Sequence, residues 1–155
     1  MIGKRIRVYA DTSVFGGSCD ARFAQASDVF FGIVRQGRFE LVVSTIVEDE
    51  LENAPEPVRA IWHDMLPLAD LQEPSREALA LQEAYLDANI LTSKWDQDAL
   101  HVALATVSNC SAIVSWNFRH IVNFRRIPLY NGVNVSQGYR SIAICSPLEM
   151  IEDEE

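Results

Sequence analysis

Cysteine and histidine are scarce in this 155-residue sequence, and long apolar runs are absent. Its cysteines, Cys19, Cys110 and Cys145, are odd in number and widely spaced, which argues against a disulfide framework and favours reduced thiols. The histidines share no spacing with them, so we expect no zinc finger. No apolar run approaches the length of a membrane span, and residues 1–13 lack a signal-peptide core. We therefore expect a cytoplasmic protein with no membrane partner.

Positive charge is also in short supply, because 13 Lys and Arg face 22 Asp and Glu and the net charge is −9. This sign disfavours holding nucleic acid by bulk attraction. Part of the excess lies at the end, where we expect residues 148–155 to form an acidic tail, and basic residues cluster at 4–7 and 119–126. An acidic protein can act on a polyanion if divalent cations neutralise its site and a basic rim receives the backbone. The charge excludes only tight, metal-free binding.

The size and patterning predict one α/β domain over residues 1–155, with no linkers or repeats. Short β-branched or apolar runs alternate with amphipathic segments, which favours a three-layer α/β/α sandwich with a central parallel sheet. Residues 66–71 fit either an edge strand or a connector, and Asn131, Gly132 and Gly138 indicate a polar loop. The expected strands are 6–10, 39–43, 111–116 and 142–145, and the expected helices are 23–36, 45–54, 58–65, 75–88, 94–109, 117–123 and 147–151.

Polar side chains follow the expected strands where a parallel sheet binds its ligands. Asp11 ends the first strand, ahead of Thr12, Ser13 and a glycine turn, and Ser115 and Asn117 end a later strand. The carboxyl ends of parallel strands and the starts of the following helices share one rim of the sheet. A capping role, in which Asp11 binds the backbone of its own loop, is the alternative for that carboxylate.

Two helices bring further acids to this rim. Neighbours differ by about 100° around a helix, so only one of Glu48, Asp49 and Glu50 can point inward, and Glu50 lies nearest the apolar face. Asp98 shares a face with apolar residues, whereas Asp96 follows Ser93 at capping-box spacing. We therefore predict Glu50 and Asp98 as site residues and Asp96 as a cap.

Crowded carboxylates repel one another and raise each other's pKa unless a cation offsets them. Hard oxygen ligands of this kind suit Mg²⁺ or Mn²⁺. Asp11, Glu50 and Asp98 are thus candidate metal ligands, and the bound cation would activate a water and clamp a scissile phosphate.

With these residues in place, the chain resembles the PIN-domain ribonucleases, most closely their VapC-like toxin branch. The likeness covers essentially the whole chain, and its pieces are VYADTSVFGG (8–17), STIVEDELENAP (44–55), DALHVALAT (98–106), VSWNFRHIVN (114–123) and GYRSIAICSPLEMI (138–151). It implies phosphodiester cleavage of single-stranded or looped RNA, an antitoxin partner that occludes the site, and a homodimer.

The resemblance implies that Asp11, Glu50 and Asp98 coordinate the metal and that Ser13 or Thr12 binds a metal-bound water or phosphate. Many family members carry another acid where this chain has Asn117. An Asn carbonyl orients a water but adds no charge, so one-metal and weakened two-metal catalysis both stay open. Asn117 could also cap the short helix that we expect after it.

Other candidates have structural alternatives. His101 is expected to be a hydrogen-bonded core residue rather than a base, whereas Arg119 and His120 either contact phosphate, with Ser115 nearby, or lie on a solvated face. A dehalogenase-type phosphotransferase would need a second acid at Ser13, and a receiver domain would need an acidic pair and a late lysine. The stronger alternative is a PIN-like binding module that has lost cleavage through Asn117.

Overall fold

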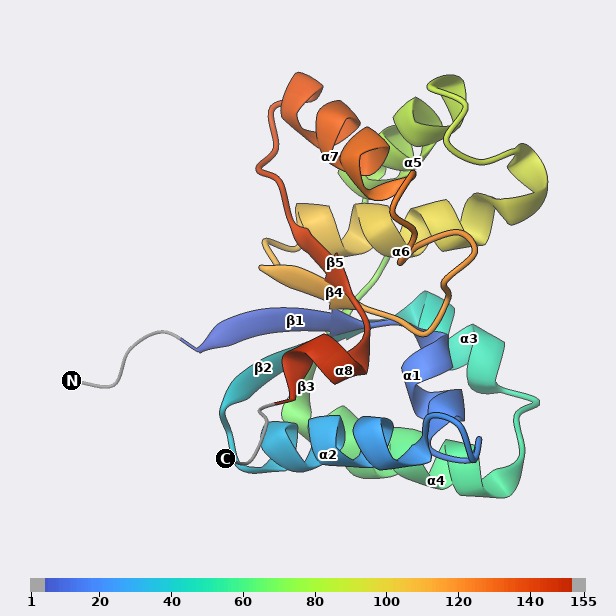
Figure 1. Ribbon diagram of the computed structural model, residues 1–155, viewed down its shortest axis with the longest axis vertical. Coiled ribbons are helices and arrows are strands. Elements are labelled where there is room, and N and C mark those ends of the chain that lie inside the picture. The colour runs from blue at the N-terminus through green and yellow to red at the C-terminus, as the bar shows by residue number, and fades with distance from the viewer. Residues whose placement is uncertain (1–4, 152–155) are drawn as a thin grey trace.

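An all-parallel sheet of five strands forms the centre of the computed structural model, which describes residues 5–151 (Figure 1). The strand order is β3-β2-β1-β4-β5, and every neighbouring pair is parallel. Residues 66–71, which the sequence left undecided, include an edge strand, because β3 pairs with β2 in parallel. The strands are β1 (Ile6–Ala10), β2 (Phe39–Ser44), β3 (Ala69–Gln72), β4 (Ala112–Val114) and β5 (Ala143–Cys145).

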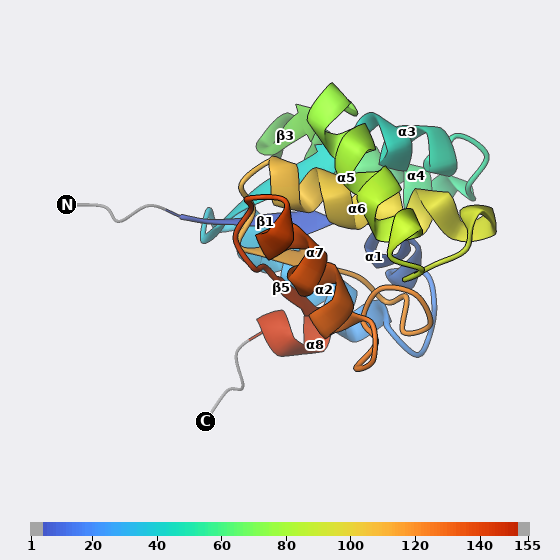
Figure 2. The same ribbon diagram turned by 90° about the horizontal axis from the view of Figure 1, so that it is seen from above.

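Helices cover both faces of this sheet. Helices α5, α6 and α7 lie on one side, and α1, α2, α4 and α8 lie on the other (Figures 1 and 2). The predicted three-layer α/β/α sandwich is therefore confirmed. No helix within residues 5–151 is long and apolar enough to cross a membrane. The helices are α1 (Thr12–Gly17), α2 (Ala24–Arg35), α3 (Thr45–Leu51), α4 (Glu56–Met65), α5 (Arg76–Asp87), α6 (Asp96–Val107), α7 (Ile127–Ser136) and α8 (Pro147–Met150), with 3-10 turns η1 (Leu66–Leu68) and η2 (Ser93–Trp95).

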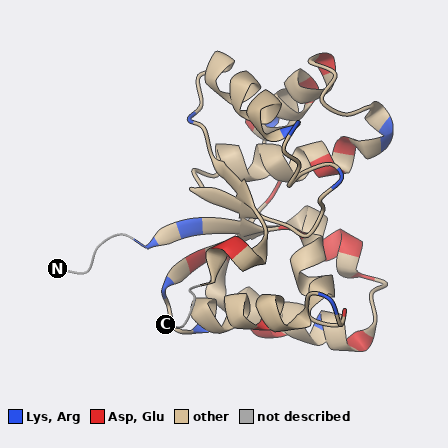
Figure 3. Cartoon of the chain, in the orientation of Figure 1, with Lys and Arg blue, Asp and Glu red and all other residues tan. Residues whose placement is uncertain are grey.

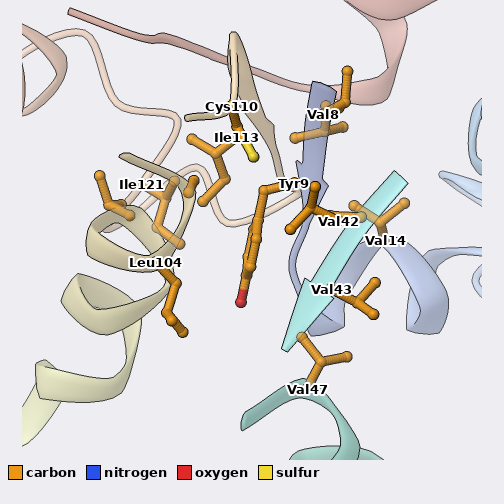
Figure 4. Packing of buried hydrophobic residues seen from close by; sticks show 14 of the residues in the cluster. Val8, Tyr9, Val14, Val42, Val43, Val47, Leu104, Cys110, Ile113 and Ile121 are labelled. Atoms are coloured by element: carbon orange, nitrogen blue, oxygen red, sulfur yellow. The ribbon is translucent and has the colours of Figure 1, made fainter. Parts of the chain in front are cut away.

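Burial on both faces explains why the central strands are apolar at consecutive positions. Val8, Tyr9 and Ala10 of β1 are all fully buried, as expected when helices cover a parallel sheet on both sides. Tyr9 is paired in register with Val42 and Ile113 on the flanking strands. Figure 4 shows its ring packed among aliphatic side chains. The sheet thus buries the phenol of Tyr9 in the core, where its hydroxyl needs a polar partner.

Three local predictions are wrong. The segment after β1, expected to be a loop, is the helix α1. The expected short helix at 117–123 is a series of turns, and the expected polar loop around Asn131 is the helix α7. Asn134 in α7 is fully buried, accepts a hydrogen bond from the Tyr85 hydroxyl and donates one to Thr106. The asparagines of this segment therefore serve a packed interface rather than a solvated turn.

The segment expected to be an acidic tail begins within a helix. Residues 148–150 belong to the short helix α8, which packs on α2 and follows β5. Residues 152–155, which carry four of the five acids expected in the acidic tail, lie outside the described residues.

Candidate active site

The candidate site lies where the sheet reverses its winding. From β1 the chain proceeds to β2 and β3 on one side, whereas β4 and β5 lie on the other side of β1. Ligands of open parallel sheets bind at the carboxyl ends of the strands at such a point. Asp11 follows β1 there, and Ser115 follows the paired end of β4. The backbone N–H of Asp11 donates to the carbonyl of Val114 at 3.2 Å, which joins the two strand ends.

Asp11 is a buried carboxylate held by serine hydroxyls. Its Oδ1 accepts hydrogen bonds from the Ser13 backbone at 3.1 Å and the Ser13 hydroxyl at 2.6 Å. Its Oδ2 accepts one from the Ser115 hydroxyl at 2.6 Å. The side chain is therefore the N-cap of α1 as well as a candidate ligand. Burial raises the pKa of Asp11, although the charge of His101 and the two serine hydroxyls oppose the shift.

The two serines also tie Asp11 to the segment after β4. The Ser13 hydroxyl accepts a hydrogen bond from the backbone of Trp116 at 2.8 Å, and the Ser115 hydroxyl accepts one from the backbone of Asn117 at 2.9 Å. Serine is suited to this position because one hydroxyl can donate to a carboxylate while it accepts from a backbone N–H. Both predicted substrate-binding serines thus contact Asp11.

Glu50 on α3 contacts a buried histidine of α6. Its Oε1 accepts a hydrogen bond from His101 Nε2 at 2.6 Å. The other ring nitrogen lies 2.7 Å from the Tyr9 hydroxyl, which is also 2.7 Å from the Ser44 hydroxyl. Ser44 in turn is the N-cap of α3, the helix that carries Glu50. A closed set of hydrogen bonds therefore connects β1, the start of α3 and α6.

The charges of all three candidate acids act on His101. The ring is only 2% exposed, and the expectation of a hydrogen-bonded core histidine is confirmed. Although burial favours the neutral ring, the hydrogen bond to Glu50 and the charges of Asp11, Glu50 and Asp98 raise the pKa of His101. The three carboxylates, which come from separate segments, therefore lie within electrostatic reach of one buried ring.

Asp98, like Glu50, contacts a histidine. Its Oδ2 accepts a hydrogen bond from His120 Nδ1 at 2.8 Å, and the His120 ring lies 4.4 Å from the Trp95 ring. His120 is only 5% exposed, so the solvated face that we considered for it is wrong. The neighbouring Arg119 is exposed, with its guanidinium over Trp95 at 5.5 Å.

The capping role predicted for Asp96 is wrong. A 3-10 turn, Ser93–Trp95, precedes α6, so Trp95 occupies the N-cap position and no side chain caps this helix. The turn removes the helical spacing that a Ser93–Asp96 capping box requires. Asp96 is instead the first residue of α6, and its carbonyl accepts a hydrogen bond from the Gln82 side chain at 2.8 Å.

Asn117 caps a turn rather than a helix. Its Oδ1 accepts hydrogen bonds from the backbone of Arg119 at 3.2 Å and of His120 at 2.9 Å. The amide oxygen that could orient a metal-bound water is thus engaged with the backbone of its own turn. Through that turn Asn117 also positions His120, the partner of Asp98.

Tyr9 and Ser44 were missed by sequence reasoning. Tyr9 alternates with apolar residues in an apolar strand, and nothing local shows that its hydroxyl reaches a histidine 92 positions later. One signal was present, because Tyr9 and Asp11 are two positions apart and the end of an extended strand places such residues on one side. The Thr12 hydroxyl is buried at the start of α1 and has no hydrogen-bond partner among residues 5–151.

The oxygens of these side chains suit a hard cation, but their present arrangement is not a metal cage. Within residues 5–151, no group of three or more His, Cys, Asp or Glu side chains is placed to hold a metal ion. Glu50 and Asp98 each bind a histidine through one carboxylate oxygen. The donor chemistry therefore fits Mg²⁺ or Mn²⁺, and the histidine contacts are those that a cation would compete with.

Comparison with known proteins identifies the fold. No protein-family model matches the sequence, and no curated protein matches it. Among solved structures, the chain is similar to one in the crystal structure of VapBC2 from Rickettsia felis bound to a DNA fragment from their promoter. The TM-score is 0.55 at 14% identity, over 74% of this chain and 90% of that one. The fold is PIN-like. At this identity the likeness concerns the fold alone.

Proposed function

We propose that this protein is a metal-dependent endoribonuclease that hydrolyses phosphodiester bonds of single-stranded or looped RNA. The observation that carries the proposal is that Asp11 lies at the switch point of a PIN-like sheet and that Asp11, Glu50 and Asp98 all lie within electrostatic reach of the buried ring of His101, which Glu50 contacts. Each of these acids also has a structural partner, but three carboxylates within reach of one ring repel one another. Their mutual repulsion is offset when a divalent cation binds among them.

Each side chain has a role in this proposal. Asp11, Glu50 and Asp98 would hold Mg²⁺ or Mn²⁺, which when bound supplies an activated water and a clamp on the scissile phosphate. The hydroxyls of Ser13 and Ser115 keep the Asp11 carboxylate in one orientation. Thr12 follows β1, and Asn117 and Arg119 follow β4. In this proposal Thr12 and Arg119 contact substrate together with the two serines, and Asn117 completes the catalytic set.

The test is cleavage of mixed RNA with Mg²⁺ or Mn²⁺, compared with a chelator. Asp11→Asn should abolish the activity. The chain also offers matched pairs: Glu50→Gln against Glu48→Gln on α3, and Asp98→Asn against Asp96→Asn on α6. Loss of a metal ligand should cost several kcal/mol of transition-state stabilisation, or about 100-fold in rate and more, at positions 50 and 98 only. Cleavage that survives the chelator, or equal losses within each pair, would refute the proposal.

The alternative is a binding module with weakened catalysis, and one observation favours it. Asn117 supplies no charge, and its carbonyl is already used by its own turn. A module of this kind would retain RNA or a protein partner without cutting RNA. Retention of intact RNA in the presence of Mg²⁺, unchanged by Asp11→Asn, would support this alternative over the nuclease.

We further propose that the protein is the toxin of a cytoplasmic toxin–antitoxin pair and forms a homodimer. The similar solved structure is a VapBC2 complex, which supports an antitoxin partner. Exposed apolar side chains on and before α7, among them Phe124, Leu129 and Val135, support self-association. The adjacent reading frame should encode a short protein that copurifies with this one, and sedimentation velocity should report a dimer.

A further inference from the structure

A hollow of about 570 Å³ opens beside Asp98, outside the acids and serines of the site. Its walls are the end of α5 with the loop that follows, and the turns that precede α7. Figure 3 shows basic positions at η2 and on the turns that precede α7, and acidic positions at the end of α5 and at the start of α6. The side chains that carry the argument are Ile90, Trp95, Arg119, His120 and Arg126.

The hollow shares a wall with the candidate active site. His120 lines it and at the same time donates to the Asp98 carboxylate at 2.8 Å. The buried Tyr130 hydroxyl donates to the carbonyl of His120 at 2.7 Å. Charges of the candidate site and of the hollow both act on this hydroxyl. Burial raises the pKa of Tyr130, the charge of Asp98 raises it further, and the charge of Arg126 lowers it. Arg126 and Asp98 therefore lie within electrostatic reach of one phenol.

Hydrogen bonds to backbone carbonyls hold the Arg126 side chain and leave some of its N–H donors unused. Its Nε donates to the carbonyl of Ile90 at 3.2 Å, and its Nη1 donates to the carbonyl of Arg119 at 3.0 Å. Nη2 makes no hydrogen bond to any described residue. A guanidinium carries five N–H donors in a planar fork that matches a phosphate. The backbone contacts thus hold the fork so that part of it is available to a ligand.

Arg119 adds a second cation. Its guanidinium lies over the Trp95 ring, and its side chain makes no ion pair or hydrogen bond within residues 5–151. Arg126 likewise has no carboxylate partner in that range, whereas Arg7, Arg22 and Arg35 are paired with acids. Arg119 and Arg126 outnumber the one acid among the residues that line the hollow, Asp87, so the hollow suits an anionic ligand.

We propose that this hollow binds the phosphodiester backbone of the single-stranded RNA next to the scissile bond. Arg126 and Arg119 contact successive phosphates, and Trp95 holds the Arg119 guanidinium over its ring. The inference rests on the proposed nuclease function and gives that site its substrate-binding wall. An extended strand suits the hollow because its volume is that of pockets for whole small molecules, about 300–1,000 Å³, rather than for one phosphate group.

The experiment measures binding of a fluorescein-labelled, mixed-sequence single-stranded RNA by anisotropy, with Ca²⁺ in place of Mg²⁺ and RNA integrity checked on gels. Arg119→Gln and Arg126→Gln are compared with Arg125→Gln, an adjacent exposed arginine that does not line the hollow. All three variants change the net charge equally. Each hollow variant should weaken binding about tenfold, as expected for a lost charge-assisted contact. Plotted against the logarithm of the salt concentration, the logarithm of the association constant should also fall less steeply in each hollow variant, by about 0.7 in slope.

Arg125→Gln should bind within about twofold of the wild type. Equal losses in all three variants, wild-type affinity in Arg119→Gln, or equal affinity for a duplex of the same sequence would overturn the proposal. Arg119→Gln decides the matter if Arg126→Gln does not fold, because no hydrogen bond within the described residues depends on its side chain. If binding depends on the arginines but no metal-dependent cleavage occurs, the nuclease function is rejected and RNA binding in the hollow is supported. If cleavage occurs but binding does not depend on the arginines, the nuclease function is supported and RNA binding in the hollow is rejected.

Discussion

Gly17, the last residue of α1, lies against the indole of Trp116 with no room for a side chain. A Cβ at this position would lie 2.5 Å from Trp116 Nε1 and 2.7 Å from Ser27 Oγ. Trp116 cannot move away freely, because Nε1 donates to Ser27 Oγ at 2.8 Å and the ring is stacked on Phe23 at 4.2 Å. Gly17→Ala therefore tests how tightly the segment after β4 is packed against α1.

The expected loss is about 2 kcal/mol of unfolding free energy. Overpacking a close-packed site costs about 1–3 kcal/mol, and a strained or broken Trp116–Ser27 hydrogen bond costs about 1 kcal/mol more. The better helix propensity of alanine returns up to about 1 kcal/mol. Gly16→Ala is the matched control, because a Cβ at Gly16 has no atom within 4 Å and should gain roughly 0.5–1 kcal/mol.

Thermal unfolding followed by circular dichroism separates the two variants. A difference near 3 kcal/mol in a chain of 155 residues corresponds to roughly 6–12 °C in Tm. Gly17→Ala should also reduce RNA cleavage, since the Trp116 backbone donates to Ser13, which holds Asp11. Equal Tm values for the two alanine variants would show that Trp116 yields at little cost, and the packing argument would fail.

Three further outcomes are expected. Tyr9→Phe should lower the unfolding free energy by about 1–3 kcal/mol in urea titrations, because it leaves His101 Nδ1 buried without the hydroxyl that now lies 2.7 Å away; an unchanged midpoint would contradict this. Because burial raises the pKa of Asp11, its carboxyl favours folding below the ordinary value of 3.8 and loses that contribution as the pH rises through the folded value. Asp11→Asn should therefore be more stable than the wild type at pH 7, with the advantage gone below about pH 4 in denaturant titrations, and a less stable variant at pH 7 would reverse the argument. Asn117→Asp retains an oxygen for the backbone of its turn and adds a charge, so calorimetry should show several-fold tighter Mg²⁺ or Mn²⁺ binding; no change would place residue 117 away from the cation.

The layered fold could be predicted because its signals are local and repeated. Phe39–Val43 is apolar except for Glu40, as expected of a strand covered on both faces, and helical spacing marks α2, α5 and α6. Where polar residues serve tertiary contacts, the same logic failed. Asn131 indicates a loop in the sequence, yet its side chain and that of Asn134 bind Ile142, Tyr85 and Thr106 across the layer. A pattern along the chain cannot show that a distant hydroxyl satisfies a buried amide.

For the candidate site, strand-end topology places Asp11 and Ser115 on one rim, and helical geometry distinguishes Glu50 from its neighbours. Glu50, the acid that helical geometry favours, contacts His101 of α6. The choice between Asp96 and Asp98 rested partly on a capping box that does not form. The contact between Asp98 and His120 supports the same choice for a different reason.

The partners of the three acids could not be inferred, because each comes from another part of the fold. Asp11 is held by Ser115 after β4, Glu50 by His101 of α6, and Asp98 by His120. The acids are therefore oriented only once β1, β4, α3 and α6 have all packed together. A substitution that loosens this packing, such as Gly17→Ala, should reduce activity without touching any acid. For this reason loss of cleavage alone does not identify a ligand in this site, and the matched acid pairs on α3 and α6 are the stricter test.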